Sequence, residues 1–131
     1  MKKVYVPVFA LCLVFMAFQC EDDIHLTQEQ EALELNTLKQ TIDDLASQPL
    51  CNESTECNYI AFGSKPCGGP WGYLIYSTAI DEEKLIMLVE EYNQKQDAFN
   101  KKWDVVSDCS VALPPTNINC ENNTCIAVYQ N

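Results

Sequence analysis

Apolar residues recur every three or four positions in two stretches of the chain, which is the period of an amphipathic helix. The first stretch covers residues 27–48, where the repeated positions are Leu35, Leu38, Ile42 and Leu45. Thr27 and Gln30 have the spacing of a capping box at its start, and Pro49 favours a stop at its end. Because the apolar stripe is short, we expect it to pack on the domain rather than to face a partner protein.

A second, longer helix is predicted over residues 81–103. Its repeated face consists of Leu85, Leu88, Val89, Tyr92, Gln96, Phe99 and Trp103, with Gln96 as the polar interruption. Acidic residues open the segment at 81–83 and two lysines close it at 101–102, in the order that the helix dipole favours. We expect the aromatic residues of this face to belong to the core rather than to a cofactor site.

Runs of β-branched and aromatic residues predict four strands. They lie at residues 58–62, 71–78, 105–113 and 126–129. Turn-forming residues stand between Cys120 and Cys125, so we expect a hairpin tip there. Helices that are segregated from the strands make an α+β domain. We therefore predict one antiparallel sheet of about four strands, packed by the two helices.

The most biased segment, residues 63–72, joins the first two predicted strands and holds all four glycines of the protein. Its Lys65 is the only basic residue between Lys39 and Lys84, and a disulfide through Cys67 would make the loop rigid. Rigid loops with a cation and an aromatic residue bind partners with little loss of entropy. The candidate binding residues are Lys65, Cys67, Trp71, Tyr73 and Tyr76. The alternative is a loop that only ties two strands together.

The first residues of the chain have the pattern of an export signal. Lys2 and Lys3 precede an apolar run over residues 4–18. This run has about 15 residues, short of the ~20 that a helix needs to span a bilayer. Acidic residues follow directly after it, at 21–23. We therefore interpret the segment as a signal rather than a transmembrane anchor.

The end of this segment reads Ala-Phe-Gln-Cys over residues 17–20, followed by Glu-Asp-Asp over 21–23. It resembles a bacterial lipoprotein signal, and the acidic residues are similar to the export tag of surface lipoproteins in the Bacteroidota. The resemblance covers residues 1–23. It implies a signal peptide over 1–19, lipid on Cys20 and an acidic tether over 20–26. A single disulfide-rich α+β domain over 27–131 would follow, on an outer-membrane lipoprotein of the cell envelope facing either the periplasm or the outside.

The cysteine count supports this division of the chain. Of eight cysteines, Cys12 would leave with the signal and Cys20 would carry the lipid. The remaining six are Cys51, Cys57, Cys67, Cys109, Cys120 and Cys125. An even number in an oxidising compartment predicts three disulfides, and their pairing is left open. With ordinary cleavage instead, Cys20 would pair with another cysteine.

Removal of the signal peptide would also change the net charge of the protein. Loss of Lys2 and Lys3 takes the formal charge from −11 to −13. Nucleic-acid binding needs a basic face, so we expect no nucleic acid among the partners. Attachment to a membrane would depend on the lipid at Cys20, because an acidic surface is repelled by anionic headgroups.

Few residue patterns in the chain favour catalysis. His25 is the single histidine, beside the lipid site, and there is no arginine. The six remaining cysteines contain no Cys-x-x-Cys pair, and no phosphate-binding glycine loop occurs. Runs of acidic residues at 43–44, 81–83 and 90–91 fit solvated helix faces. We expect no catalytic residue, no metal site and no cofactor.

The expected function is therefore that of a lipid-anchored binding module in the cell envelope, which contacts a protein partner. Two alternatives stay open. The first is a small protease inhibitor that inserts Lys65 from the loop at 63–72, although Pro66 after it makes a poor mimic of a cleavable bond. The second is a structural protein of the envelope.

Overall fold

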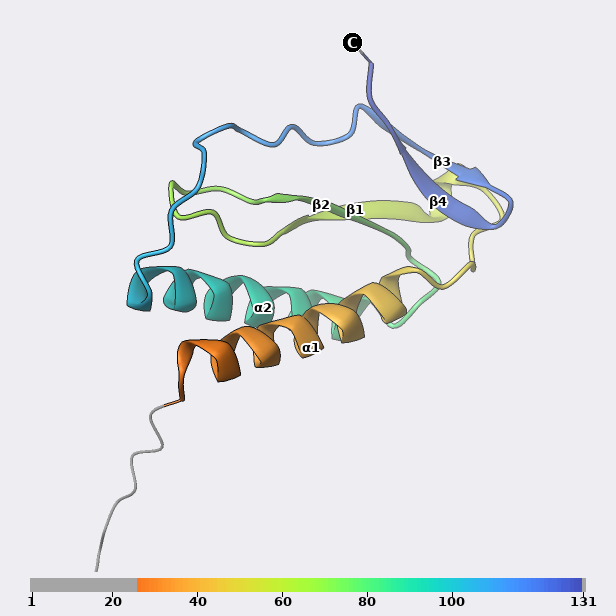
Figure 1. Cartoon of the computed structure of the whole chain (residues 1–131). Helices are drawn as coiled ribbons and strands as arrows, with labels where there is room; N and C mark the ends of the chain where they lie inside the picture. The colour runs from red at the N-terminus through yellow and green to blue at the C-terminus, as the bar shows by residue number, and fades with distance from the viewer. Residues whose placement is uncertain (1–25, 131) are drawn as a thin grey trace, which may run out of the picture.

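The computed structural model describes residues 26–130. The predicted signal peptide, Cys20 and nearly all of the acidic tether lie outside these residues. Two helices and four strands follow one another along the chain (Figure 1): α1 (Gln28–Ala46), β1 (Cys57–Phe62), β2 (Gly72–Ser77), α2 (Glu82–Lys102), β3 (Asn117–Glu121) and β4 (Thr124–Val128), with a 3-10 turn at Ser54–Glu56. The predicted α+β class is confirmed.

Both helices begin where the sequence places their caps. The Thr27 hydroxyl accepts the Gln30 N–H at 3.3 Å, and the Gln30 side chain accepts the Thr27 N–H at 2.9 Å, which completes the predicted capping box. On α2, the Asp81 carboxylate accepts the Lys84 N–H at 3.1 Å. Each cap satisfies backbone donors that a helix start leaves free.

The helices lie side by side and antiparallel on one face of the β1–β2 hairpin (Figure 1). The end of α2 is tied to the start of α1 through Glu31. Its carboxylate accepts the Trp103 indole N–H at 2.7 Å and forms an ion pair with Lys102. Both hydrogen bonds lower the pKa of Glu31, and the one from Lys102 has the larger effect.

The four strands form two separate sheets, and the prediction of a single sheet is wrong on this point. β1 pairs with β2 in antiparallel register from Cys57↔Ser77 to Phe62↔Gly72. β3 pairs with β4 around Cys120↔Cys125, which confirms the predicted hairpin tip. Asn122 and Asn123 both have positive φ at this tip, as a two-residue turn requires.

The strand predicted over residues 105–113 does not form, and β3 begins only at Asn117. The segment between α2 and β3 crosses the molecule as extended but irregular chain (Figure 1). Val106, Val111 and Leu113 are largely exposed there. High β-propensity describes residues that fit a half-buried pleated surface, and no neighbouring strand supplies that surface to this segment.

The hydrophobic core lies between the helix pair and the β1–β2 hairpin. Its buried members come from α1, β2, α2 and the β2–α2 turn: Leu35, Ile42, Ala46, Tyr76, Ile80, Leu85, Val89 and Tyr92. Phe62 of β1 stacks on Tyr92 with ring centroids 4.8 Å apart. Both predicted helix stripes therefore face the core. Among residues 26–130, no helix combines the length and the apolar character that crossing a membrane would need.

Candidate functional site

The loop at 63–72 joins β1 to β2 and is fixed to α2 through its backbone. Gly63 N–H donates to the Asn93 side chain at 2.7 Å, and Ser64 N–H donates to the Gln96 side chain at 2.6 Å. Asn100 of α2 donates in turn to the Ser64 carbonyl at 2.8 Å. Amide side chains on one face of α2 thus hold the first residues of the loop in place.

Lys65, predicted as a candidate binding cation, is directed into the protein. Its side chain is only 6% exposed. The ammonium donates to the Asp108 carboxylate at 2.9 Å, to the Ser110 carbonyl at 2.7 Å and to the Ser110 hydroxyl at 3.0 Å. The hydrogen bond from Lys65 is the main cause that lowers the pKa of Asp108. Lys65 therefore cross-links the loop to the extended segment after α2 and offers no accessible cation.

Two further candidate residues also have structural positions. Cys67 forms a disulfide with Cys109, beside the Lys65 contacts. Tyr76 is 2% exposed, and its hydroxyl donates to Glu82 at 2.8 Å. Burial, reinforced by Glu82, raises the pKa of Tyr76 to about 12. The prediction that Lys65 and Tyr76 are accessible to a partner is therefore wrong, because long-range packing encloses both side chains.

Trp71 remains accessible, and it borders a surface hollow of about 300 Å³. We call this hollow the aromatic groove. It lies between the loop, β1, β2 and both helices, and its lining side chains include Phe62, Trp71 and Tyr92 together with Lys39, Asp43 and Gln96. The loop supplies one wall, and α1 supplies a charged rim. The Tyr73 side chain lies on the opposite face of the hairpin, because side chains alternate along β2 and those of Leu74 and Tyr76 face the core. There it packs against Tyr59 with ring centroids 5.5 Å apart.

The position of Trp71 is closely determined although its side chain is 46% exposed. Its backbone N–H donates to the Phe62 carbonyl at 3.0 Å, and the Lys65 ammonium lies 4.9 Å from the ring centroid. The ring also rests on Gly63, where an added Cβ would come within 2.8 Å of Trp71 Cδ1. Trp71 is therefore a supported aromatic surface beside a hollow.

The α1 and α2 residues of the groove are not among the residues predicted from the sequence. Lys39 and Asp43 form an i,i+4 ion pair at 2.6 Å, and the Lys39 ammonium lies 5.8 Å from the Phe62 ring centroid. Both precede the loop by 20 or more positions in the chain. Gln96 is marked in the sequence as the one polar residue in the apolar stripe of α2. Its carbonyl oxygen binds Ser64 and its amide donates to the Tyr92 hydroxyl at 3.3 Å.

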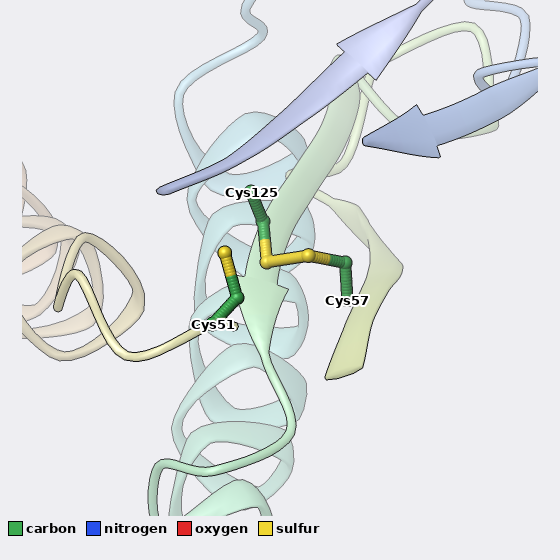
Figure 2. Close-up of side chains that lie close together, drawn as sticks. All are labelled: Cys51, Cys57 and Cys125. Atoms are coloured by element: carbon green, nitrogen blue, oxygen red, sulfur yellow. A yellow bond between two sulfur atoms is a disulfide. The ribbon is translucent and has the colours of Figure 1, made fainter. Parts of the chain in front are cut away.

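Three sulfur atoms outside the groove lie within 4.8 Å of one another, those of Cys51, Cys57 and Cys125 (Figure 2). Each belongs to a disulfide: Cys51 pairs with Cys120, and Cys57 pairs with Cys125. A metal ion binds thiolates, and sulfur in a disulfide is not a thiolate. The cluster is two adjacent disulfides, and all three predicted disulfides are confirmed.

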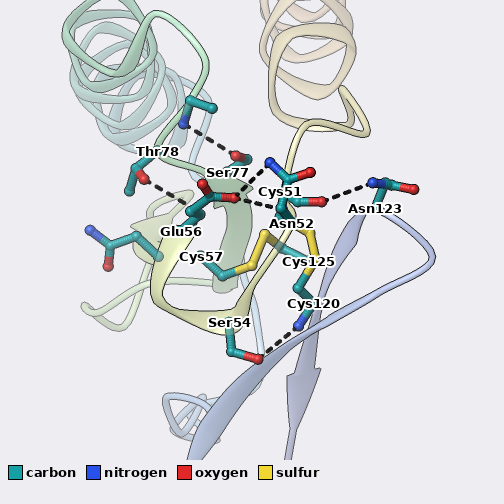
Figure 3. The surroundings of a disulfide bond; sticks show 12 residues. Cys51, Asn52, Ser54, Glu56, Cys57, Ser77, Thr78, Cys120, Asn123 and Cys125 are labelled. Atoms are coloured by element: carbon teal, nitrogen blue, oxygen red, sulfur yellow. Dashed lines mark hydrogen bonds between the residues drawn. A yellow bond between two sulfur atoms is a disulfide. The ribbon is translucent and has the colours of Figure 1, made fainter.

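Hydrogen bonds around these disulfides attach the β3–β4 hairpin to the segment that precedes β1 (Figure 3). The Cys120 N–H donates to the Ser54 hydroxyl at 3.1 Å. The Asn123 side chain donates to the Cys51 carbonyl at 3.2 Å. The surroundings therefore consist of polar cross-links that support a structural role.

Comparison of the chain with models of protein families, with curated proteins and with solved structures finds no match. The function is therefore argued from the groove and its residues.

Proposed function

We propose that this chain is a small binding module of the bacterial cell envelope, held at the membrane by lipid on Cys20, and that the aromatic groove is its binding site. Trp71 carries the proposal. It is a large aromatic side chain, about half exposed, that borders a hollow and is fixed from below by Gly63 and Lys65. Aromatic residues in such positions dominate the free energy of binding at many interfaces.

The support beneath the loop favours binding because little order has to be gained on association. The Cys67–Cys109 disulfide, the Lys65 contacts and the amide side chains of α2 hold the loop before any ligand arrives. A ligand that packs on Trp71 then avoids most of the entropy cost of arranging a flexible loop. This pre-organisation is the physical reason to prefer a binding role over a purely structural one.

The alternative of a protease inhibitor requires an accessible Lys65, and this side chain is buried. Insertion of Lys65 into a protease would require breaking its contacts with Asp108 and Ser110. The 6% exposed side chain would also have to leave its position below Trp71. The geometry therefore favours the groove over an inserted lysine.

The membrane attachment is tested separately from the groove. We expect the full-length protein, expressed in a bacterium that processes lipoproteins, to sediment with the membranes. The Cys20→Ala variant has no lipid acceptor and should be recovered in the soluble fraction. Membrane sedimentation of the variant to the same extent as the wild type would contradict the anchor.

The groove is tested with the soluble Cys20→Ala protein and isolated cell envelopes of the source bacterium immobilised on a sensor. Trp71→Ala should lower the affinity about tenfold or more, as expected for a central aromatic residue. Leu33→Ala on α1 is the matched control, because Leu33 is 65% exposed and does not line the groove. Equal binding by both variants and the parent protein would contradict the proposed site.

A further inference from the structure

The charged residues of the aromatic groove cancel each other. Lys39 and Asp43 are the charged side chains that line it, and their ion pair measures 2.6 Å. The whole chain nevertheless carries a formal charge of −11. A cationic or anionic ligand would find no net opposite charge at the groove, and electrostatic complementarity is a main source of specificity for charged ligands. The groove therefore fits a neutral ligand.

The same groove is rich in polar atoms with capacity to spare. The Lys39 ammonium has three protons and uses one on Asp43, whose carboxylate can accept several hydrogen bonds. Donors and acceptors thus stand close together. A ligand that carries both kinds of group satisfies them, whereas an apolar ligand would leave them unsatisfied.

Trp71 adds an exposed ring face to these polar atoms. The faces of aromatic rings carry negative potential and attract weakly positive C–H groups. A pyranose sugar has C–H groups on one face and hydroxyl groups, each a donor and an acceptor, around its edge. It can therefore stack on Trp71 while its hydroxyls reach Lys39 and Asp43. The volume of about 300 Å³ is at the small end of ligand sites and suits one or two sugar units.

We infer that the aromatic groove binds a short stretch of a neutral glycan, with Trp71 as the stacking residue and Lys39 and Asp43 as hydroxyl-binding residues. This inference rests on the proposed function and names the ligand class of the same site. Binding is a non-covalent equilibrium and needs no cofactor.

The test uses tryptophan fluorescence, because the chain has only two tryptophans. In the Cys20→Ala protein, Trp103→Phe leaves Trp71 as the single reporter. It is titrated with maltohexaose, cellohexaose, xylohexaose, mannohexaose and chitohexaose, and separately with hexalysine and polygalacturonate. We expect saturable quenching by at least one neutral oligosaccharide at up to millimolar concentrations, and no quenching by either charged polymer.

Calorimetry with the responding oligosaccharide then assigns the residues. Trp71→Ala should weaken binding about tenfold or more, while Trp71→Phe keeps a ring face and loses less. Asp43→Asn removes one hydroxyl-binding carboxylate from the surface and should weaken binding without lowering the unfolding temperature by more than a few degrees. Met87→Ala is the matched control, since Met87 is exposed on α2 away from the groove.

Two results overturn the inference and leave the proposed function intact. In the first, envelope binding depends on Trp71, but no oligosaccharide quenches its fluorescence or competes. In the second, protease treatment of the envelopes abolishes Trp71-dependent binding, which identifies a protein ligand. If envelope binding does not depend on Trp71 at all, the proposed function fails as well.

Discussion

Gly63 is the residue on which the shape of the aromatic groove depends most closely. Its φ of +80° lies in the left-handed region, where a side chain is strained. An added Cβ would also lie 2.8 Å from Trp71 Cδ1 and 3.0 Å from Gln96 Oε1. Backbone conformation and available space therefore both require glycine. The contact explains how a single small residue sets the position of the exposed Trp71 ring.

Gly63→Ala tests this point, with Gly69→Ala as the matched control. Gly69 has nearly the same φ, +81°, but nothing lies within 4 Å of an added Cβ. We expect Gly69→Ala to lower the free energy of unfolding by about 1 kcal/mol through backbone strain alone. Gly63→Ala should cost a further 1–3 kcal/mol or so, because Trp71 must move. Urea denaturation measures the free energy of unfolding of both variants. Equal decreases would show that the contact with Trp71 does not contribute to stability.

Ionisation of Tyr76 lowers the stability of the protein at alkaline pH. Burial, together with its hydrogen bond to Glu82, raises its pKa from 10.0 to about 12 in the folded state. A raised pKa contributes stability below the unfolded value, and this contribution is lost as the pH rises from 10 towards 12. Tyr76→Phe removes the titrating group. We expect its free energy of unfolding to fall less than that of the wild type between pH 9 and about 11. Parallel curves would contradict the raised pKa.

Among the elements, the segment between α2 and β3 is held by cross-links rather than by a sheet. It lies across the molecule without a strand partner, and the Cys67–Cys109 disulfide and Lys65 attach it to the loop at 63–72. The Lys65 ammonium is enclosed and needs its acceptors, since an unsatisfied buried charge is costly. Asp108, in contrast, is 73% exposed, so it stabilises this element through its partner rather than through its own burial.

Asp108→Asn should therefore destabilise the protein although the residue is exposed. Lys65 lowers the pKa of Asp108 below its ordinary value of 3.8. Stability from a lowered carboxylate pKa is present above that value and is lost as the pH falls through the folded pKa. We expect Asp108→Asn to lower the urea midpoint at pH 7 and to lose less stability on acidification than the wild type. Asp44→Asn on the exposed face of α1 is the control, and matching behaviour of the two variants would contradict the role of Asp108.

At the scale of the whole molecule, the hydrophobic core and the disulfides stabilise different parts of the chain. The buried core comes from residues before position 93, and β3 and β4 contribute nothing to it. Instead, three disulfides with sequence separations of 69, 68 and 42 residues connect the last part of the chain to the first. Loops of this length give about 4 kcal/mol per disulfide in the chain-entropy account, and the contributions are not additive.

Reduction should consequently release the β3–β4 hairpin before the core unfolds. Under mild reduction, we expect amide hydrogens of β3 and β4 to lose protection from exchange while those of α1, α2 and the β1–β2 hairpin keep theirs. The Cys57→Ser/Cys125→Ser double variant should show a weaker form of the same effect, since Cys51–Cys120 remains. Simultaneous loss of protection in all elements would contradict this order.

The local elements of this protein follow from short-range sequence signals. The capping box at Thr27, the apolar stripes of α1 and α2 and the Asn122–Asn123 turn all depend on residues within a few positions of one another. The expectation that six cysteines pair with each other needs only their even number and an oxidising compartment, whatever their distance in the chain. Local chemistry is enough for the helices and the turn, and a count is enough for the number of disulfides, so the sequence alone determined them.

Only the tertiary structure decided how these parts meet. It separated the strands into two sheets, left residues 105–113 without a partner, chose one disulfide pairing and enclosed Lys65. It also brought Lys39 and Asp43 of α1 to Trp71. Each of these outcomes joins residues that are far apart in the chain. Their proximity depends on which packing buries the most apolar surface for the whole molecule, and no local pattern contains that information.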